Sequence, residues 1–431
     1  MILKNGTIVT MNPDFEVLEG DIRIDGDSIQ NLGKLNPDPG EDVIDLEGKV
    51  VLPGLIQAHV HLCQTIFRNM AEDRPLLPWL QEKIWPLEAG LTEDTTRISA
   101  ELAIAELLKG GTTSVLTMET VRNTEVVLDA VRRSGIRAVV GKALMDRENR
   151  GHPNGLKESI NDAITDIEEL LATWSGSDNG RIGICLAPRF ALSVSPEFFE
   201  CIVEFSRQHN LIIHTHASES KDETKVVRQE TGMGNIEYFH KLGLLGEKLC
   251  VAHCIWVSDR EIELLADSSS HVLHCPTANL KLGSGIAPII EMLEKGVSGA
   301  IGADGAPCNN NLDVFAEMKL AGLLQKVRKG ADALPARDIL AMATISGAKA
   351  LGQEDRIGSI EIGKKADLTI LDLDKPHSMP GNDDLYSRIV YSARPDNVDS
   401  VWIGGKLVVN GGRLLTLDEQ DIINRAKHAT K

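Results

Sequence analysis

The sequence predicts an α/β protein, a (β/α)₈ TIM barrel with a small discontinuous β-sandwich domain built from both termini. Apolar runs with strand character alternate with helical patterns through the middle of the chain. Short strands separated by glycine-rich turns recur at both ends. Several apolar runs also end in histidine or a carboxylate, at the end of the strand where barrel active sites lie.

The middle of the chain supplies the barrel. The runs with strand character span residues 52–61, 113–118, 137–144, 182–189, 211–218, 249–255, 271–277 and 299–304. Helical patterns lie between them, for example at 95–109, 124–133, 156–174, 196–209, 259–267 and 288–295. Eight strand–helix units with right-handed crossovers favour a closed barrel. An open doubly wound sheet is the alternative, and the lack of a G-x-G-x-x-G motif counts against it.

The two ends of the chain share a pattern of short strands separated by turns. Strands are expected at 2–3, 7–10, 21–25 and 43–46, and again at 357–360, 366–371, 398–403 and 406–409. We therefore expect residues 1–53 and 355–431 to form the β-sandwich domain together. Residues 54–354 would then form the metal-dependent catalytic barrel.

Composition limits the partners. The chain has 431 residues, a formal net charge of −18 and 4% aromatic residues. Such a protein is poorly suited to nucleic acid, so we expect a small neutral or cationic substrate. No apolar run reaches the roughly 18 residues of a membrane span, so no membrane contact is expected. The seven cysteines form no C-x-x-C pair, which fits reduced thiols in a cytoplasmic protein.

The ends of the predicted strands gather metal-binding side chains. His59 and His61 point to the same face because side chains alternate along a strand. The other strand-end candidates are His214 and His216 with Glu219 after the fifth run, His253 after the sixth and Asp304 after the eighth. Five of the 12 histidines thus fall at strand ends, which a random scatter would rarely produce.

Imidazole and carboxylate groups are suitable donors for Zn²⁺. A bound cation of this kind lowers the pKa of its water from about 15.7 to about 7. Asp304 can accept a proton from that water, and Glu219 can carry a proton to the departing group. These are the groups that hydrolytic attack on a carbon bearing an amine or amide nitrogen requires.

Nearby residues have structural interpretations. We interpret His214 and His274 as hydrogen-bonded core histidines of the barrel. A thiolate metal site at Cys254 and Cys275 is disfavoured, because the spacing is not that of a zinc ribbon and cysteine is commonly buried. Lys142 lies on the third run and is interpreted as structural or substrate-facing.

Several segments resemble the amidohydrolase superfamily. They are residues 52–61 (LPGLIQAHVH), 216–219 (HASE), 252–254 (AHC), 274–285 (HCPTANLKLGSG), 302–310 (GADGAPCNN) and 363–368 (GKKADL). The motifs appear in the order of that family and extend over almost the whole chain. Residues 279–288 and 309–313 are most similar to the branch that deaminates methylthioadenosine, S-adenosylhomocysteine and 5′-deoxyadenosine.

The resemblance implies roles for individual residues. It implies one divalent metal ion, Zn²⁺ with Fe²⁺ or Mn²⁺ as alternatives, whose ligands are His59, His61, His216 and Asp304. It also implies Glu219 as the proton shuttle at the purine ring nitrogen, His253 as the group that orients the water, and Glu88 as the residue that holds the ribose hydroxyls.

The fourth strand end departs from this branch. Relatives that act on methylthioadenosine have a histidine after the proline, whereas Pro188 is followed here by Arg189 and Phe190. That pair resembles guanine deaminases, in which arginine and phenylalanine hold the base, so Arg189 is expected to bind substrate. Two-metal relatives carry a bridging lysine on this strand, and its absence implies a mononuclear site. The loop 146–153 would supply a further cation from Arg147, with Arg150 as the alternative.

The sequence therefore predicts a zinc-dependent aminohydrolase that acts on C–N bonds of cyclic amidines and deaminates an adenine nucleoside. The products would be the inosine analogue and ammonia. The nearest alternatives are a guanine deaminase and an s-triazine hydrolase that displaces chloride or an amine. A non-catalytic assembly protein on the same barrel is an alternative of another class. Because oligomers are common in the family, we expect a homo-oligomer.

Overall fold

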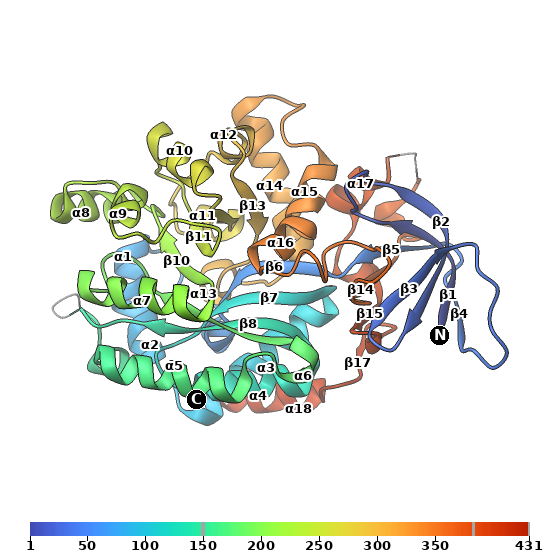
Figure 1. Cartoon of the computed structure of the whole chain (residues 1–431), viewed down its shortest axis with the longest axis horizontal. Helices are drawn as coiled ribbons and strands as arrows, with labels where there is room; N and C mark the ends of the chain where they lie inside the picture. The colour runs from blue at the N-terminus through green and yellow to red at the C-terminus, as the bar shows by residue number, and fades with distance from the viewer. Residues whose placement is uncertain (148–150, 382–383, 430–431) are drawn as a thin grey trace.

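Eight parallel strands follow one another around the centre of the molecule (Figure 1), in the order of the chain. The computed structural model describes residues 1–147, 151–381 and 384–429. The barrel strands are β6 (Leu55–Val60), β7 (Thr112–Met118), β8 (Arg137–Leu144), β9 (Ile182–Pro188), β10 (Ile213–Ala217), β11 (Leu249–His253), β12 (His271–His274) and β13 (Ser298–Ile301). Beyond β13, a parallel bridge between Val60 and Asp304 brings the last strand back to the first. The predicted barrel is confirmed.

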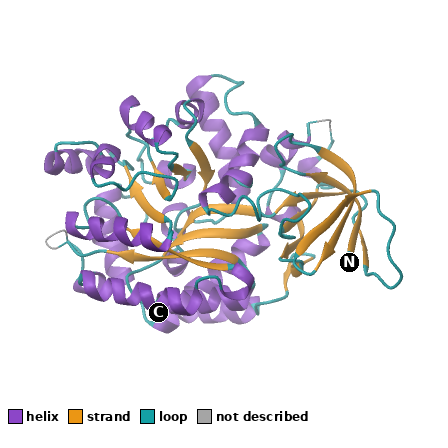
Figure 2. Ribbon diagram, in the orientation of Figure 1, coloured by secondary structure: helices purple, strands orange, loops and turns teal. Residues whose placement is uncertain are grey.

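Helices surround the strands and separate them from solvent (Figure 2). Those of the barrel are α1 (Leu76–Trp79), α2 (Trp85–Ala89), α3 (Glu93–Lys109), α4 (Thr124–Ser134), α5 (Ile160–Trp174), α6 (Ser177–Gly180), α7 (Pro196–His209), α8 (Lys221–Thr231), α9 (Asn235–Lys241), α10 (Asp259–Asp267), α11 (Pro276–Lys281), α12 (Ile289–Glu294), α13 (Ala306–Asn309), α14 (Val314–Lys329), α15 (Ala336–Met342) and α16 (Ile345–Ala350). A π-helical turn, η2 (Leu80–Ile84), joins α1 to α2.

The local sequence explains these elements. Every residue of β7 is buried, as expected for a strand covered on both faces, and its threonine and valine residues favour extended backbone. Helix α7 begins where Ser195 accepts a hydrogen bond from the Phe198 backbone N–H, with Pro196 in the first turn. Its apolar side chains then recur at helical spacing and are buried against the barrel.

The two termini combine into a second, mixed sheet beside the barrel (Figure 1). Its strands are β1 (Ile2–Val9), β2 (Val17–Asp25), β3 (Ser28–Gly33), β4 (Val43–Asp45), β5 (Lys49–Pro53), β14 (Leu368–Asp372), β15 (Val398–Ile403), β16 (Lys406–Asn410) and β17 (Arg413–Leu414). The antiparallel pairing of β5 with β14 joins the N-terminal to the C-terminal part of the sheet. The discontinuous domain built from both ends is thus present as one continuous sheet.

One expected strand is wrong. Residues 357–360 are irregular, because Gly358 adopts a positive φ of 87° and a Cβ there would lie 2.6 Å from the Ala348 side chain. A single hydrogen bond from the Ile360 N–H to the Thr10 carbonyl ties the segment to the sheet. The chain passes from sheet to barrel at Gly54, between β5 and β6.

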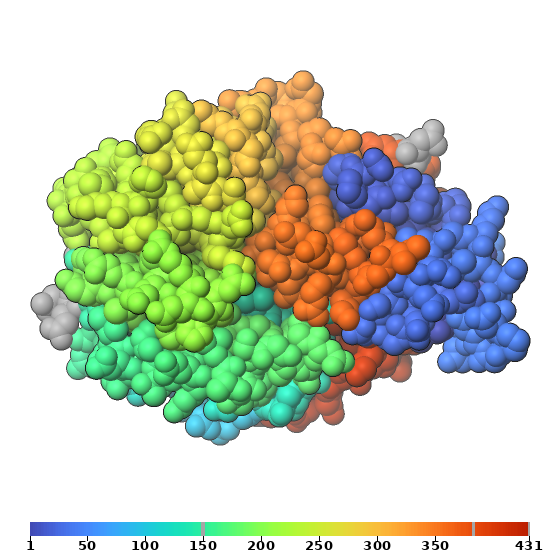
Figure 3. Space-filling model, viewed as in Figure 1, coloured from blue at the N-terminus to red at the C-terminus, as the bar shows by residue number. Residues whose placement is uncertain are grey.

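The sheet and the barrel are held together by a buried ion pair. The Arg137 guanidinium, at the start of β8, donates two hydrogen bonds to Asp367, and both side chains are almost fully buried. Figure 3 shows the blue N-terminal sheet lying directly against the orange part of the chain. The C-terminal helix α18 (Glu419–Ala429) leaves the sheet, and Arg425 pairs with Glu101 of α3. The domain boundaries at 1–53 plus 355–431 and 54–354 stay a prediction.

The helices can be compared with membrane-spanning segments in length and apolar character. None of those in the described part of the chain combines the length and apolar character that crossing a bilayer requires.

Candidate active site and metal centre

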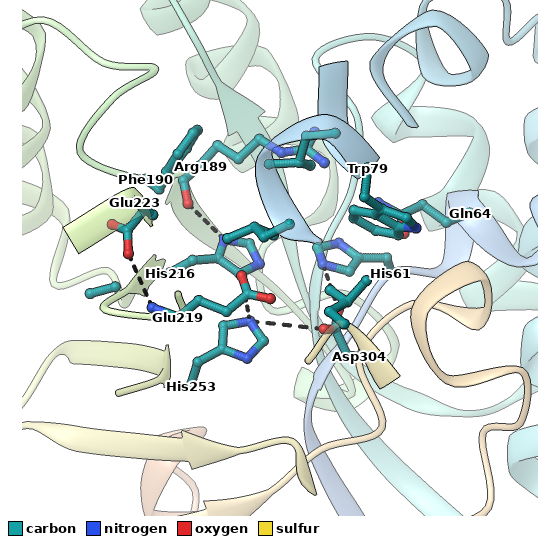
Figure 4. A pocket seen from close by; sticks show the side chains of 14 residues that line it. His61, Gln64, Trp79, Arg189, Phe190, His216, Glu219, Glu223, His253 and Asp304 are labelled. Carbon is teal, nitrogen blue, oxygen red and sulfur yellow. Dashed lines mark hydrogen bonds and ion pairs between the residues drawn. The ribbon is translucent and has the colours of Figure 1, made fainter. Parts of the chain in front are cut away.

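Four predicted metal ligands meet at the carboxyl end of the barrel. His59, His61, His216 and Asp304 each offer one donor atom, and these atoms all lie within 4.8 Å of one another. His59 lies in β6 and His61 directly follows it, His216 lies in β10, and Asp304 is the residue that bridges β6 beyond β13. Figure 4 shows His61, His216 and Asp304 turned toward the same pocket. Residues from three separate parts of the chain therefore converge as the strand-end argument predicts.

The far side of each imidazole is engaged. The Nδ1 atom of His61 lies 2.6 Å from the Met118 carbonyl, and that of His216 lies 2.6 Å from the Arg189 carbonyl. Because a carbonyl only accepts, each Nδ1 carries the proton and each Nε2 lone pair faces the centre. The buried Nε2 of His59 faces Asp304, with 3.4 Å between Nε2 and Oδ1, and makes no well-aligned hydrogen bond within the described chain. Three imidazole nitrogens and a carboxylate fit a divalent ion such as Zn²⁺.

Burial also favours the neutral imidazoles that a metal needs. Desolvation lowers the pKa of His59 to about 4 and that of His216 well below its ordinary value. At His61 desolvation acts in the same direction, but the adjacent Asp304 outweighs it and the pKa is raised. His61 Nε2 and His59 Nε2 lie 3.2 Å and 3.4 Å from Asp304 Oδ1, and these two neighbouring histidines hold the pKa of that carboxylate well below its usual range despite burial.

His253 and Glu219 stand beside the ligand group. The Nδ1 atom of His253 donates to Asn279 Oδ1 at 2.8 Å. Its Nε2 atom lies 3.4 Å from Glu219 Oε2 and 3.8 Å from Asp304 Oδ2. Burial and the neighbouring Asp304 raise the pKa of Glu219 well above its ordinary value, which favours the protonated carboxyl group. The arrangement places an acid, Glu219, next to a possible acceptor for water, His253 Nε2.

The backbone is strained where these side chains emerge. Ser218, His253 and Asp304 have positive φ values of 53°, 74° and 66°. Non-glycine residues rarely adopt this region, and such strain concentrates at functional sites. At Asp304 the cost is offset in part by its N–H, which donates to the His59 carbonyl at 3.0 Å. The turn thereby aims the carboxylate back at the histidines of β6.

Glu88 and Arg189 contact each other. Arg189 Nη1 donates to Glu88 Oε2 at 2.6 Å, and Gln64 Nε2 donates to Glu88 Oε1 at 2.8 Å. Both Arg189 and Gln64 line the pocket, whereas Glu88 lies behind them and is not among the described lining residues. The pocket therefore presents a cation where the sequence predicts a carboxylate that holds hydroxyl groups.

Other predicted residues lie outside the pocket lining. Arg147 is not among the described lining residues and pairs with Glu230 at 3.1 Å. Its alternative, Arg150, lies outside the described residues. Lys142 is almost fully buried and its Nζ contacts Glu158 and the Val121 carbonyl, which fits the structural interpretation.

The two core histidines differ from each other. His214 is buried and hydrogen-bonded, but its partner is the metal-ligand candidate His59. His274 is buried too, yet neither ring nitrogen has a hydrogen-bond partner within the described chain, so its interpretation as a bonded core residue is wrong. Because His214 and His216 alternate along one strand, both side chains point to the same face. This pattern would have indicated that His214 lies beside the metal-ligand candidates.

Sequence reasoning missed several residues of the pocket. Gln64, Trp79, Leu80 and Glu223 line it together with Phe190 and the other residues that the sequence singled out. Glu223 accepts the backbone N–H of Glu219 at 3.1 Å, and burial raises its pKa to about 8. Its spacing of four from Glu219 would have signalled this contact at a helix start. Trp79 directly precedes the π-helical turn and Leu80 begins it, and such a turn has no periodic sequence pattern that would predict it.

Comparisons with known proteins agree over the full chain. The amidohydrolase family model matches residues 50–408. The chain is 37% identical over 435 residues to the 5′-deoxyadenosine deaminase of Methanosarcina mazei, covering 100% of this chain and 98% of the relative. It is 36% identical to the 5-methylthioadenosine/S-adenosylhomocysteine deaminase of Caldanaerobacter subterraneus, covering 98% and 96%. A zinc-bound adenosine deaminase from Xanthomonas campestris superposes with a TM-score of 0.93 at 32% identity, covering 100% and 97%.

Proposed function

Because the chain belongs to the amidohydrolase family, we propose that it is a metal-dependent hydrolytic deaminase of adenine nucleosides. The substrate class is 5′-deoxyadenosine, methylthioadenosine, S-adenosylhomocysteine or adenosine. Water replaces the amino group at C6 of the purine, and the products are the inosine analogue and ammonia. One observation carries the proposal: four metal donors lie within 4.8 Å of one another, and three of them line a pocket that Glu219 and His253 also line.

The metal ligands in this proposal are His59, His61, His216 and Asp304. A divalent cation, Zn²⁺ by the donor set and the zinc-bound relative, would lower the pKa of the attacking water toward about 7. The chain's own residues handle the protons. The Nε2 atom of His253 orients the water, and the ionised Asp304 accepts its proton.

Glu219 supplies the acid. Its raised pKa favours the protonated carboxyl group, which would protonate the purine ring nitrogen next to C6 as the C–O bond forms. Asp304 then passes the proton from the water to the amino group, the C6–N bond breaks and ammonia leaves, and the C6 hydroxyl returns a proton to Glu219, so the overall reaction consumes one water. Glu223 holds the Glu219 backbone in place while this happens.

Substrate binding is proposed for Glu88, Arg189, Glu219 and Arg147. The first two act as a unit, because Glu88 is already engaged by Arg189 and Gln64. A nucleoside would contact Glu88 only if its hydroxyls compete with, or add to, these donors. Arg147 would have to exchange Glu230 for substrate.

A second candidate follows from the same contact. The guanidinium of Arg189, rather than the carboxylate of Glu88, faces the pocket, and such a wall suits a free base with an acceptor oxygen. This favours guanine deamination among the alternatives. Glu88→Gln separates the two candidates, because it should weaken ribose-bearing substrates strongly and spare free bases. No feature of the described site specifically favours the other two alternatives, a triazine hydrolase and a non-catalytic assembly protein.

The test is ammonia release from 5′-deoxyadenosine, methylthioadenosine, S-adenosylhomocysteine, adenosine and guanine, assayed side by side. The zinc-loaded protein should release ammonia from at least one adenine nucleoside faster than from guanine. Glu219→Gln, which keeps the shape of the side chain, should slow release by about 10²–10⁴-fold without loss of zinc. No release from any purine by zinc-loaded protein would overturn the proposal.

We also propose a cytoplasmic homo-oligomer. All seven cysteines are free, which suits a reducing compartment. On one face of α14, Leu323 is 43% and Val327 is 84% exposed, and such apolar positions suit a contact between copies. Light scattering on the purified chain tests the oligomer, and Val327→Glu should dissociate it.

A further inference from the structure

Behind the ligand group lies a histidine that does not reach the metal position. The His214 ring meets the His59 ring edge to face, and His214 Nε2 lies 2.7 Å from His59 Nδ1. Both side chains are completely buried. We propose that His214 is a positioning residue that fixes the tautomer of His59 and so keeps its Nε2 lone pair directed at the metal. The inference rests on the metal site proposed above, not on the nucleoside substrate.

His59 needs such a partner more than the neighbouring ligands do. The Nδ1 atoms of His61 and His216 face backbone carbonyls, which can only accept. The Nδ1 atom of His59 faces another ring nitrogen, which can either donate or accept. If His214 Nε2 carried a hydrogen, His59 Nδ1 would have to accept a hydrogen bond from it. The single hydrogen of the neutral His59 ring would then lie on Nε2. A protonated Nε2 cannot bind a cation.

The other nitrogen of His214 decides between these arrangements. His214 Nδ1 lies 3.3 Å from the carbonyl oxygen of Thr117, which can only accept. This contact keeps the proton of His214 on Nδ1 and leaves Nε2 bare. His59 then donates from Nδ1, and its Nε2, which lies 3.4 Å from Asp304 Oδ1, presents a lone pair to the ligand group. The contacts form a one-way chain from His59 through His214 to Thr117.

The same strand end therefore orients two ligands. Thr117 and Met118 are the last residues of β7, and the Met118 carbonyl holds His61 directly. The Thr117 carbonyl holds His59 through His214. The ligands His59 and His61 are thus both oriented by consecutive backbone carbonyls at the end of β7. Partners of this kind typically change metal affinity by about 10–100-fold when removed.

The direct test is nitrogen NMR of the unaltered, zinc-loaded chain with ¹⁵N-labelled histidine. We expect His214 with the hydrogen on Nδ1 and a bare Nε2, and His59 with the hydrogen on Nδ1. A hydrogen on His214 Nε2 in the zinc-loaded protein would overturn the proposal. This measurement needs no variant to fold and no substrate to turn over.

The variant test measures zinc affinity by competition with a chelator. His214→Phe keeps a flat ring but removes the acceptor, and should weaken zinc binding by about 10–100-fold. His214→Gln retains an acceptor oxygen and should restore affinity to within a few-fold of the unaltered chain. The control is His271→Phe at the opposite end of the barrel, which removes a buried histidine from β12 and should leave affinity unchanged.

Folded His214→Phe protein with unchanged zinc affinity would overturn the proposal, as would an equal loss in His214→Gln. Failure of the proposed deaminase function is a separate result. A chain that binds zinc as expected but releases no ammonia from any purine would refute the function and leave the role of His214 standing.

Discussion

Arg189 holds Glu88 with two hydrogen bonds, from Nη1 to Oε2 at 2.6 Å and from Nη2 to Oε1 at 3.2 Å. The exposed fractions of the two side chains are 6% and 1%. Burying two charges is costly, and the pair stabilises the fold only while both partners are present. The wall of the pocket therefore depends on two residues from separate βα units.

Removing one partner should be worse than removing both. Arg189→Met leaves a buried carboxylate without its cation and should lower the free energy of unfolding by about 3–5 kcal/mol. The double variant Arg189→Met/Glu88→Met should recover much of that loss. Urea unfolding of each protein measures it, with Lys295→Met as a control. That lysine pairs with Glu263 at the surface, so its loss should cost less than about 1 kcal/mol. A double variant no more stable than Arg189→Met would contradict the prediction.

Variants of a metal ligand and of the water-orienting histidine should differ in how much zinc the purified protein contains. His61→Asn removes a donor from the group, so the purified protein should lose stoichiometric zinc. His253→Asn should retain zinc, because His253 lies beside the group, but should slow turnover by about 10²–10⁴-fold. Metal analysis together with single-turnover kinetics distinguishes the two. Loss of zinc in both variants would place His253 among the ligands.

Gly302 sets the distance between the last strand and the first. A Cβ at this position would lie 2.5 Å from the carbonyl oxygen and 2.7 Å from the amide nitrogen of His59. Gly302→Ala must therefore displace the backbone that carries a metal ligand. We expect a loss of about 1–3 kcal/mol in unfolding free energy, together with weaker zinc binding.

Gly299, which lies in β13 three residues before Gly302, is the matched control. A Cβ there would meet only the flexible ends of Leu293, at 3.2 Å, and Met342, at 3.5 Å. Gly299→Ala should leave zinc binding unchanged. Equal effects of the two substitutions on zinc binding would show that the contact with His59 is not what matters.

Glu317 should make stability fall as pH rises. Burial raises its pKa to about 7, while the backbone N–H of Thr277 and the amide of Asn309 act in the opposite direction. The folded state then binds more protons than the unfolded state between pH 4.5 and about 7. The stabilising contribution is complete below the unfolded pKa and is lost as pH rises through the folded pKa. The total is about 3 kcal/mol.

Glu317→Gln should flatten that part of the stability curve, measured by urea unfolding from pH 5 to pH 8. Glu291→Gln serves as the control. Although burial acts upward on Glu291, Arg328 and Lys329 lower its pKa to about 2, so its contribution is lost only in acid. Between pH 5 and pH 8 the free energy of unfolding of Glu291→Gln should change with pH in the same way as that of the unaltered chain. An unchanged slope in Glu317→Gln would reject the assignment.

Local patterns predicted most of the fold. The eight apolar runs correspond to β6–β13, because strands buried on both faces leave continuous apolar stretches. The segment 357–360 shows where this fails. Its isoleucines suit a strand, but close packing of Gly358 against Ala348 imposes a backbone that cannot pair in a sheet. That packing is tertiary and leaves no local signal.

The sequence by itself determined the kinds of donor and the strand ends that carry them. Alternation along a strand places His59 with His61, and His214 with His216, whatever the rest of the chain does. Only the tertiary structure decided that Arg189 meets Glu88, 101 positions away, and that His214 supports His59, 155 positions away. Those contacts depend on how far apart strand ends stand once the barrel closes. Barrel closure follows from the packing of all the strands together, and no single segment encodes it.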